Sequence, residues 1–361
     1  MHNFLVAAAF GFGALIGSFL NVCIYRIPRQ ISLARPARSF CPNCQEMIPW
    51  HQNIPILSWF LLRGRCAHCH APISPRYVIV ETLTASLFAT AAFLVPIPTS
   101  FSVWVILSIL VVTTFVDLEF FIIPDVMSKG GIAAGLLLSL LTPELHKTSS
   151  PLVAVVFSLS GALAGAFVLF LISEFGKLAF GRYKVKLDVP ARFTLAGLPP
   201  DDWQILIEGE PFLWSDHFFR KSDRIIVHAN EVQINATAYQ NIDLTFFYDR
   251  LVTAFETMPL DRIKHLSGLT ASAQFPREAM GLGDVKLIAA IGTFVGWQGI
   301  LFTIAAASFF GAAFGIAAII LGKRERSAKI PFGPYLALGA VLWLFWGESL
   351  LSLYEGLMLR L

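Results

Sequence analysis

Charged residues are scarce in this sequence of 361 residues, and their scarcity excludes an ordinary soluble protein. Only 14% of the residues are charged, whereas soluble proteins have about 25%. Hydrophobic residues make up 56% of the chain. The formal net charge is only +3, which does not argue for nucleic-acid binding. The composition therefore predicts a polytopic membrane protein with an all-α architecture.

Basic residues are also absent from the first three positions, Met-His-Asn, where a secretory signal peptide would carry them. An apolar run follows from Phe4 to Ile24, and positive charge appears only after it, at Arg26 and Arg29. This order favours an uncleaved membrane span whose N-terminus lies outside the cytoplasm.

Eight apolar segments approach the length of about 20 residues that a membrane-spanning helix needs. The expected transmembrane helices are 4–25, 78–96, 101–122, 129–143, 152–175, 283–298, 299–321 and 332–354. Arginines crowd the loop after the first span, and Lys323, Arg324, Arg326 and Lys329 precede the last one. Because positively charged loops stay in the cytoplasm, this alternation predicts that Asp117 and Asp284 both lie near the cytoplasmic face.

One stretch, from about residue 180 to 276, interrupts the apolar pattern. Charges of both signs return, and alternating segments such as Trp203–Ile207 and Arg224–Ala229 are typical of strands. The later segment Phe246–Leu266 could form a helix. We expect a soluble, mainly β cytoplasmic insert, close to the lower size limit for independent folding. The expected domains are 1–76, with the first helix and a cysteine module; 77–179, with helices two to five; the insert 180–276; and 277–361, with helices six to eight.

Cysteines are few, and their odd number, five, does not suit a disulfide framework. Four of them form Cys41-Pro-Asn-Cys44 and Cys66-Ala-His-Cys69, with 21 residues between the two pairs. Such pairs favour a closed, tetrahedral structural zinc site over redox dithiols, because cytoplasmic thiols stay reduced. The neighbouring histidines are interpreted as ordinary polar residues: His51, His68 and His70.

Two aspartates, Asp117 and Asp284, stand beside long apolar runs. A carboxylate near hydrocarbon costs about 2.5 kcal/mol or more, so each one indicates a function. A facing pair can share a proton and activate water, whereas the alternative is two isolated helix-end charges. Asp284 follows two glycines that could open a helix, and a helix N-terminus favours an ionised carboxylate, so we expect Asp284 as base and Asp117 as acid. Asp125 is interpreted as a cap or loop residue, and Glu119 and Lys286 as interfacial charges.

Several short motifs are spread along the chain: Gly17–Pro28, Trp50, Asn53–Trp59, Arg63–Cys66, Pro72–Tyr77, Glu81, Asp117–Asp125 and Gly281–Lys286. Together they resemble the bacterial type IV prepilin peptidases, a family of GxGD aspartic intramembrane proteases. The resemblance implies that Asp117 and Asp284 are the catalytic aspartates. It also places the family's cysteine loop on Cys41, Cys44, Cys66 and Cys69. The insert departs from the family pattern.

The resemblance further implies an endopeptidase in the bacterial inner membrane that serves type IV pili or type II secretion. Such enzymes cut the basic leader from prepilins and pseudopilins after a glycine, and many N-methylate the new terminus with S-adenosylmethionine. Glu81 could attract that basic leader, or it could be a solvated helix-end charge. Two alternatives are a methyltransferase alone and a proton-coupled transporter with an aspartate relay. No nucleotide-binding motif supports the first, and the cysteine pairs and the lack of obvious inverted repeats oppose the second.

Overall fold

The computed structural model describes the chain in two compact units. One unit comprises Met1–Phe170 and Leu282–Leu361, and the other comprises Leu171–Gly281. The described residues are 2–36, 38–198, 202–218, 223–276, 281–321 and 330–358. The basic residues that precede the last expected span, at positions 323–329, lie outside these described ranges.

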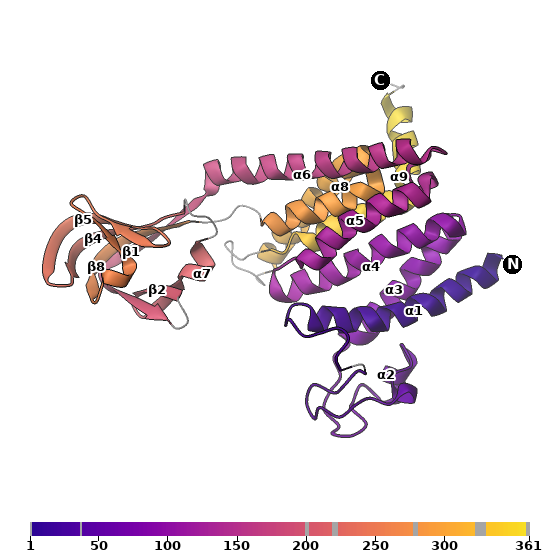
Figure 1. Cartoon of the computed structure of the whole chain (residues 1–361), viewed down its shortest axis with the longest axis horizontal. Coiled ribbons are helices and arrows are strands. Elements are labelled where there is room, and N and C mark those ends of the chain that lie inside the picture. Colours follow the sequence, from indigo (N-terminus) through magenta and orange to yellow (C-terminus); the bar gives the residue numbers. More distant parts are fainter. Residues whose placement is uncertain are drawn as a thin grey trace. The chain divides into compact units, whose positions relative to one another are not determined.

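The first unit is a bundle of long apolar helices (Figure 1). They are α1 (His2–Arg26), α3 (Arg76–Leu94), α4 (Ile97–Phe120), α5 (Asp125–Leu141), α6 (Pro151–Phe180), α8 (Leu282–Ile320) and α9 (Gly333–Met358). The last residues of α6, from Leu171, belong to the second unit. Five of these, α1, α3, α4, α6 and α8, are long and apolar enough to cross a membrane. Helix α5 has only 17 residues, and the apolar part of α9 is Gly333–Gly347. The largely helical membrane architecture is confirmed, whereas the eight crossings stay a prediction.

Helix α8 contains a sharp break at Gly296, where φ is 68° and ψ is −179°. A Cβ placed on Gly165 of α6 would lie 3.3 Å from side-chain atoms of both Ile288 and Ile300. Twelve residues of straight helix would separate those two isoleucines by about 18 Å. The chain therefore turns back at Gly296, and the two arms of α8 correspond to the spans expected at 283–298 and 299–321. The two arms join directly at Gly296. Glycine adopts the positive φ of this turn without strain, so the turn needs no longer loop.

Helices α1 and α3 approach each other closely at two glycines. A Cβ added to Gly13 would lie 2.8 Å from Cα of Ala85, and one added to Gly17 would lie 2.7 Å from Cα of Glu81. Only glycine allows two backbones so near, as in small-residue packing between membrane helices. This contact sets the position of Glu81 against α1.

The second unit contains an antiparallel sheet of eight strands among the described residues, and its mainly β character is confirmed. The strands are β1 (Arg182–Leu198), β2 (Asp202–Ile207), β3 (Glu210–Leu213), β4 (Ile225–Ile234), β5 (Thr237–Phe246), β6 (Arg250–Val252), β7 (Thr257–Pro259) and β8 (Leu266–Pro276). Their order in the sheet is β3-β2-β1-β8-β4-β5-β6-β7. The sheet is curved (Figure 1). Its core includes Phe193, Val227, Leu244 and Phe275. The short helix α7 (Trp214–His217) adds Trp214, which is 1% exposed, to this core.

The helix considered for Phe246–Leu266 is absent there, and that expectation was wrong. The segment holds the short strands β6 and β7 and the 3₁₀ turn η3 (Leu260–Arg262). Strand β6 pairs with β5, and β7 pairs with β6. The pairing with an existing sheet edge overrides the weak local preference of the segment, as tertiary context commonly does.

Candidate active site and cysteine module

Asp117 lies in the last turn of α4, and its side chain is buried, with 5% of the residue exposed. Helix α4 ends because Phe121 adopts a left-handed conformation and Pro124 follows shortly after. The Oδ2 atom of Asp117 accepts a hydrogen bond of 2.9 Å from the backbone N–H of Gly333. Gly333 is the first residue of α9, where the N–H has no partner within its own helix. The start of α9 therefore holds the Asp117 carboxylate.

Asp284 lies in the first turn of α8 and is half-buried. The preceding Gly283 packs on the segment that follows Asp117, since a Cβ on Gly283 would lie 3.1 Å from Cβ of Ile123. Helices α4 and α8 are also in direct contact. The structure therefore brings the two motif segments, which are far apart in the sequence, to one end of the helical unit.

Asp125 forms two ion pairs in the same region. Its Oδ1 atom lies 2.6 Å from Nζ of Lys286, and its Oδ2 atom lies 2.7 Å from Nζ of Lys129. Asp125 begins α5 and makes no side-chain cap, so it is an ion-paired residue at a helix start. The sequence interpretation treated Lys286 as an interfacial charge and did not predict its link to Asp125. A single ion pair between residues of two different helices leaves no periodic pattern in the sequence.

The four cysteines of the two C-x-x-C pairs converge as expected. Their sulfur atoms all lie within 4.8 Å of one another, and Sγ of Cys41 lies 3.8 Å from Sγ of Cys69. A tetrahedral zinc ion with Zn–S distances of about 2.3 Å separates its ligands by about 3.8 Å. The residues present therefore fit a four-coordinate metal ion, and none of the three nearby histidines belongs to this cluster.

The two cysteine pairs have the same local backbone. The N–H of Cys41 donates to the Glu46 carbonyl, and that of Cys66 donates to the Ala71 carbonyl. The residue after each pair, Gln45 or His70, has φ of 59°. Each pair is thus a tight turn that aims both sulfurs inward, and the two turns face each other to complete the cluster.

The thiols of this cluster share protons unequally. Hydrogen bonds from the Ala71 backbone and the Asn43 side chain lower the pKa of Cys69 to about 6. The pKa of Cys44 is raised to about 12, because burial and its thiol neighbours outweigh the lowering by the Glu46 backbone. Metal ligands bind as thiolates, so an ion bound here would displace the protons of the thiols.

Two acidic residues make contacts where the helices meet the segment between α1 and α3. Glu119, two residues beyond Asp117, pairs with Arg29 at 3.3 Å and with Arg76. Glu81, 8% exposed, accepts a hydrogen bond of 2.7 Å from the N–H of Ile56, which has φ of 65°. The sequence interpretation of Glu119 as an interfacial charge missed this double pairing, and that of Glu81 as a solvated helix-end charge is wrong because the residue is buried.

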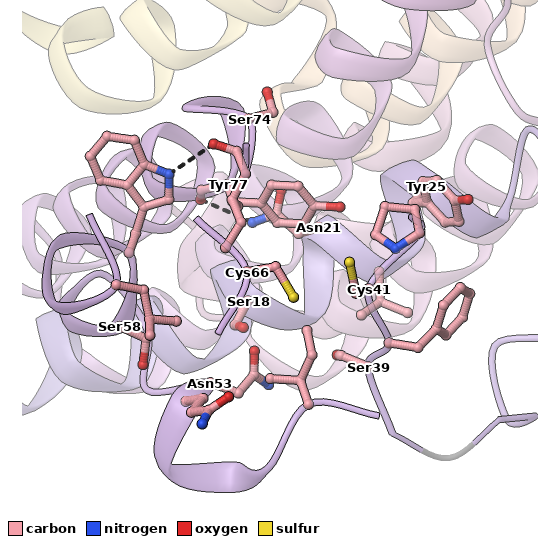
Figure 2. Close-up of a pocket in the computed structure, with 18 of the residues that line it drawn as sticks. Ser18, Asn21, Tyr25, Ser39, Cys41, Asn53, Ser58, Cys66, Ser74 and Tyr77 are labelled. Carbon is pink, nitrogen blue, oxygen red and sulfur yellow. Dashed lines mark hydrogen bonds between the residues drawn. The ribbon is translucent and has the colours of Figure 1, made fainter. Parts of the chain in front are cut away.

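A pocket of about 360 Å³ lies between α1, the cysteine module and the start of α3. Figure 2 shows Asn21, Tyr25 and Tyr77 around it together with Cys41 and Cys66. Its volume is within the range of about 300–1,000 Å³ that is typical of small-molecule sites. No feature of the sequence marks this pocket, because residues from three separate segments form its wall.

Known families match two separate stretches of the chain. Residues 12–95 match the bacterial Peptidase A24 N-terminal domain, and residues 244–316 match the type IV leader peptidase family. The four clustered cysteines fall in the first match and Asp284 in the second, whereas Asp117 lies outside both. No solved structure matches the chain.

Whole proteins resemble the chain as well. The prepilin leader peptidase/N-methyltransferase of Aeromonas hydrophila is 30% identical over 369 aligned residues, which cover 96% of this chain and 92% of that protein. The protein of the same name from Legionella pneumophila is 25% identical over 96% of this chain and 92% of its own length. The one from Myxococcus xanthus (strain DK1622) is 43% identical over 36% of this chain and 39% of its own length. The chain therefore belongs to the prepilin leader peptidase/N-methyltransferase family and is an enzyme of the membrane.

Proposed function

We propose that the chain is an aspartic endopeptidase whose catalytic pair is Asp117 and Asp284. The observation that carries the proposal is the contact between the two motif segments, through Gly283 and Ile123. The hydrogen bond from Gly333 to Asp117 supports it, because it fixes one carboxylate at that junction. Positioned carboxylates are what hydrolysis by an aspartate pair requires.

The proposed chemistry gives each aspartate a different task. One ionised carboxylate removes a proton from the attacking water, and one protonated carboxyl group donates a proton to the leaving amine. Asp284 lies in the first turn of α8, where the helix dipole stabilises negative charge, so we assign it the role of base and Asp117 that of acid. The two protonation constants then belong to the pair rather than to either residue.

The proposed substrates are type IV prepilins and pseudopilins, cut after a glycine at the cytoplasmic face of the bacterial inner membrane. Each substrate carries a basic leader, which positive-inside topology keeps in the cytoplasm. We propose eight crossings, formed by α1, α3, α4, α5, α6, the two arms of α8 and α9, with the β insert on the cytoplasmic side. This topology brings the cleavage site to the depth of the two aspartates.

We also propose N-methylation of the new terminus and a structural zinc ion. When bound, S-adenosylmethionine supplies a methyl group on a sulfonium. Zinc would be held by Cys41, Cys44, Cys66 and Cys69, which form a closed ligand set with no position for water. Its role would be to hold the cysteine module together, while the aspartates cleave without it.

The test is cleavage of a prepilin by purified variants in detergent. We expect Asp117→Asn and Asp284→Asn each to lower the rate by more than about a thousandfold, because each removes one half of an acid–base pair. The matched control is Asp125→Asn, which lies in the same region and should keep activity within about tenfold, because it breaks only exposed ion pairs. Near-normal cleavage by either of the first two variants would remove that residue from the mechanism.

A further inference from the structure

The short helix α2 (Leu57–Leu61) of the cysteine module exposes an apolar face. Leu57, Phe60 and Leu61 share that face, because helical residues three and four positions apart point the same way. They are 59%, 61% and 76% exposed. On the opposite face, the indole N–H of Trp59 donates to a backbone carbonyl within the module. The helix therefore packs its other side against the module and leaves its large apolar side chains outside.

The start of α2 lies beside two membrane helices. The N–H of Ile56, directly before α2, donates to Oε2 of Glu81. Glu81 lies five residues into α3 and packs against Gly17, which lies nine residues before the end of α1. At 1.5 Å per residue, these positions are about 7.5 and 13.5 Å inside the ends of their helices. Figure 1 accordingly shows α2 on the flank of α1 and α3 rather than beyond their ends.

The surface next to the start of α2 is one that lipid covers. Leu15 and Phe19 of α1 are 60% and 52% exposed, and α1 is long and apolar enough to cross a membrane. These two side chains line one cavity together with Pro55, two residues before α2. The chain therefore enters α2 at the lipid-facing side of α1, where an exposed apolar face meets hydrocarbon rather than water.

The charge of the module fits the surface of an anionic membrane. The sequence has no acidic residue between Glu46 and Glu81. Arg63 and Arg65 follow directly after α2, and both are exposed. An apolar helical face with basic residues beside it is typical of helices that lie in the membrane interface.

We propose that α2 is an interfacial helix that inserts Leu57, Phe60 and Leu61 into the bilayer, in the leaflet that holds the C-terminal end of α1. Arg63 and Arg65 bind the phosphate groups of anionic phospholipids there. Helices of this kind bury their apolar face by about 5–10 Å at the boundary between headgroups and acyl chains. The cysteine module is thus attached to the membrane through α2 as well as through α1 and α3.

A second copy of the chain and a basic leader peptide fit this face less well than lipid does. Each partner of a stable dimer buries about 800 Å², which is more than three side chains on one helical turn supply. A leader rich in lysine or arginine would meet Arg63 and Arg65, and like charge opposes association. A bilayer has neither difficulty, because it surrounds the neighbouring helices continuously and its anionic headgroups attract the two arginines.

The test places a photoreactive side chain on α2 in the full-length protein. Phe60→p-benzoylphenylalanine is reconstituted in nanodiscs of phosphatidylethanolamine and phosphatidylglycerol and irradiated, and mass spectrometry identifies the adducts. We expect about tenfold more phospholipid adduct than with Tyr248→p-benzoylphenylalanine, because Tyr248 is an exposed aromatic residue of the polar insert. The same replacement at Phe19 of α1 is the control for full contact with lipid.

A second reporter on the same face, Leu61→p-benzoylphenylalanine, makes the test independent of folding at any one position. Leu61 is so exposed that the larger side chain has room, and the melting temperature of each variant reports on its folding. Folded reporters at Phe60 and Leu61 that give no more phospholipid adduct than Tyr248 would overturn the proposal. Adducts to a second copy of the chain, or to an added prepilin instead of lipid, would overturn it too and assign the face to that partner.

The two arginines are tested by the headgroups of the adducts. In the Phe60 reporter, Arg63→Gln combined with Arg65→Gln should lower the ratio of phosphatidylglycerol to phosphatidylethanolamine adducts by about threefold or more, because glutamine stays polar but loses the positive charge. The matched control is Arg192→Gln, which removes an exposed arginine of the insert and should leave the ratio unchanged. An equal ratio in all three proteins would overturn the assignment of the lipid phosphates to Arg63 and Arg65.

Discussion

At the scale of single residues, Gly333 shows how a position without a side chain can control a carboxylate. Its N–H donates to Asp117, and a Cβ at this position would lie 2.8 Å from Oδ2 of Asp117 and 3.4 Å from Cγ. A methyl group there would displace the carboxyl group from its present place. Peptide hydrolysis depends on positions held to within a fraction of an ångström.

We therefore expect Gly333→Ala to lower the rate of prepilin cleavage by about ten- to a hundredfold, with little change in melting temperature. The control is Gly130→Ala on α5, where an added Cβ would meet nothing within 4 Å. Rates are measured with purified protein at saturating substrate. Equal rates for the two alanine variants would show that Asp117 tolerates displacement and would count against its catalytic role.

At the scale of elements, the cysteine module has little regular structure around its sulfur cluster. Among its described residues, the regular elements are the 3₁₀ turn η1 (Trp50–Gln52) and the short helix α2 (Leu57–Leu61). Segments this short do not hold their shape alone, so the proposed metal would stabilise the module by cross-linking its two cysteine pairs.

We expect about one zinc per chain in the purified protein, and Cys41→Ser or Cys66→Ser to lower that content severalfold. Elemental analysis under reducing, metal-replete conditions makes the measurement. Cys23→Ser serves as control, because Cys23 lies in α1 and outside the sulfur cluster. A metal-free wild type, or a zinc content that no cysteine substitution alters, would contradict the structural zinc site.

The contact between α1 and α3 provides a second test at this scale. A Cβ on Gly17 would lie 2.7 Å from the backbone of Glu81, whereas one on Gly11 of the same helix would meet nothing. We expect Gly17→Ala to destabilise the protein by about 1–3 kcal/mol through overpacking. Gly11→Ala should leave stability unchanged or raise it, because alanine is the better helix former. Thermal unfolding in detergent distinguishes the two, and identical melting temperatures would mean that the helices can move apart freely.

At the scale of the whole molecule, the β insert is a separate unit whose chain enters and leaves at one place. Tyr183 of β1 and Phe275 of β8 are paired across the sheet. Partner Cα atoms in antiparallel strands lie about 4.5–5.5 Å apart. The insert also has its own hydrophobic core.

We therefore expect a variant in which residues 184–274 are replaced by a short Gly/Ser linker to enter the membrane and to retain measurable prepilin cleavage. Four linker residues reach about 13 Å, which is more than the gap requires. Asp117→Asn in the same shortened chain is the control for background cleavage. A well-inserted, zinc-loaded deletion variant without activity at any substrate concentration would show that the insert completes the active site.

The sequence by itself determined the character of each segment, because apolar length, strand alternation and cysteine spacing are local properties. They identified the membrane helices, the β insert, the four clustered cysteines and the aspartates of the two motifs. The assignment of Phe246–Leu266 failed where local preference was weak and pairing with a sheet edge decided the outcome.

Only the tertiary structure decided which residues are neighbours. The Gly333 N–H meets Asp117 across 216 positions, and Lys286 meets Asp125 across 161. Likewise, Arg29 and Arg76 reach Glu119, and the pocket around Asn21 exists only where three segments meet. Such contacts depend on how helices pack and on where backbones can approach, and neither is encoded in the period of any one segment.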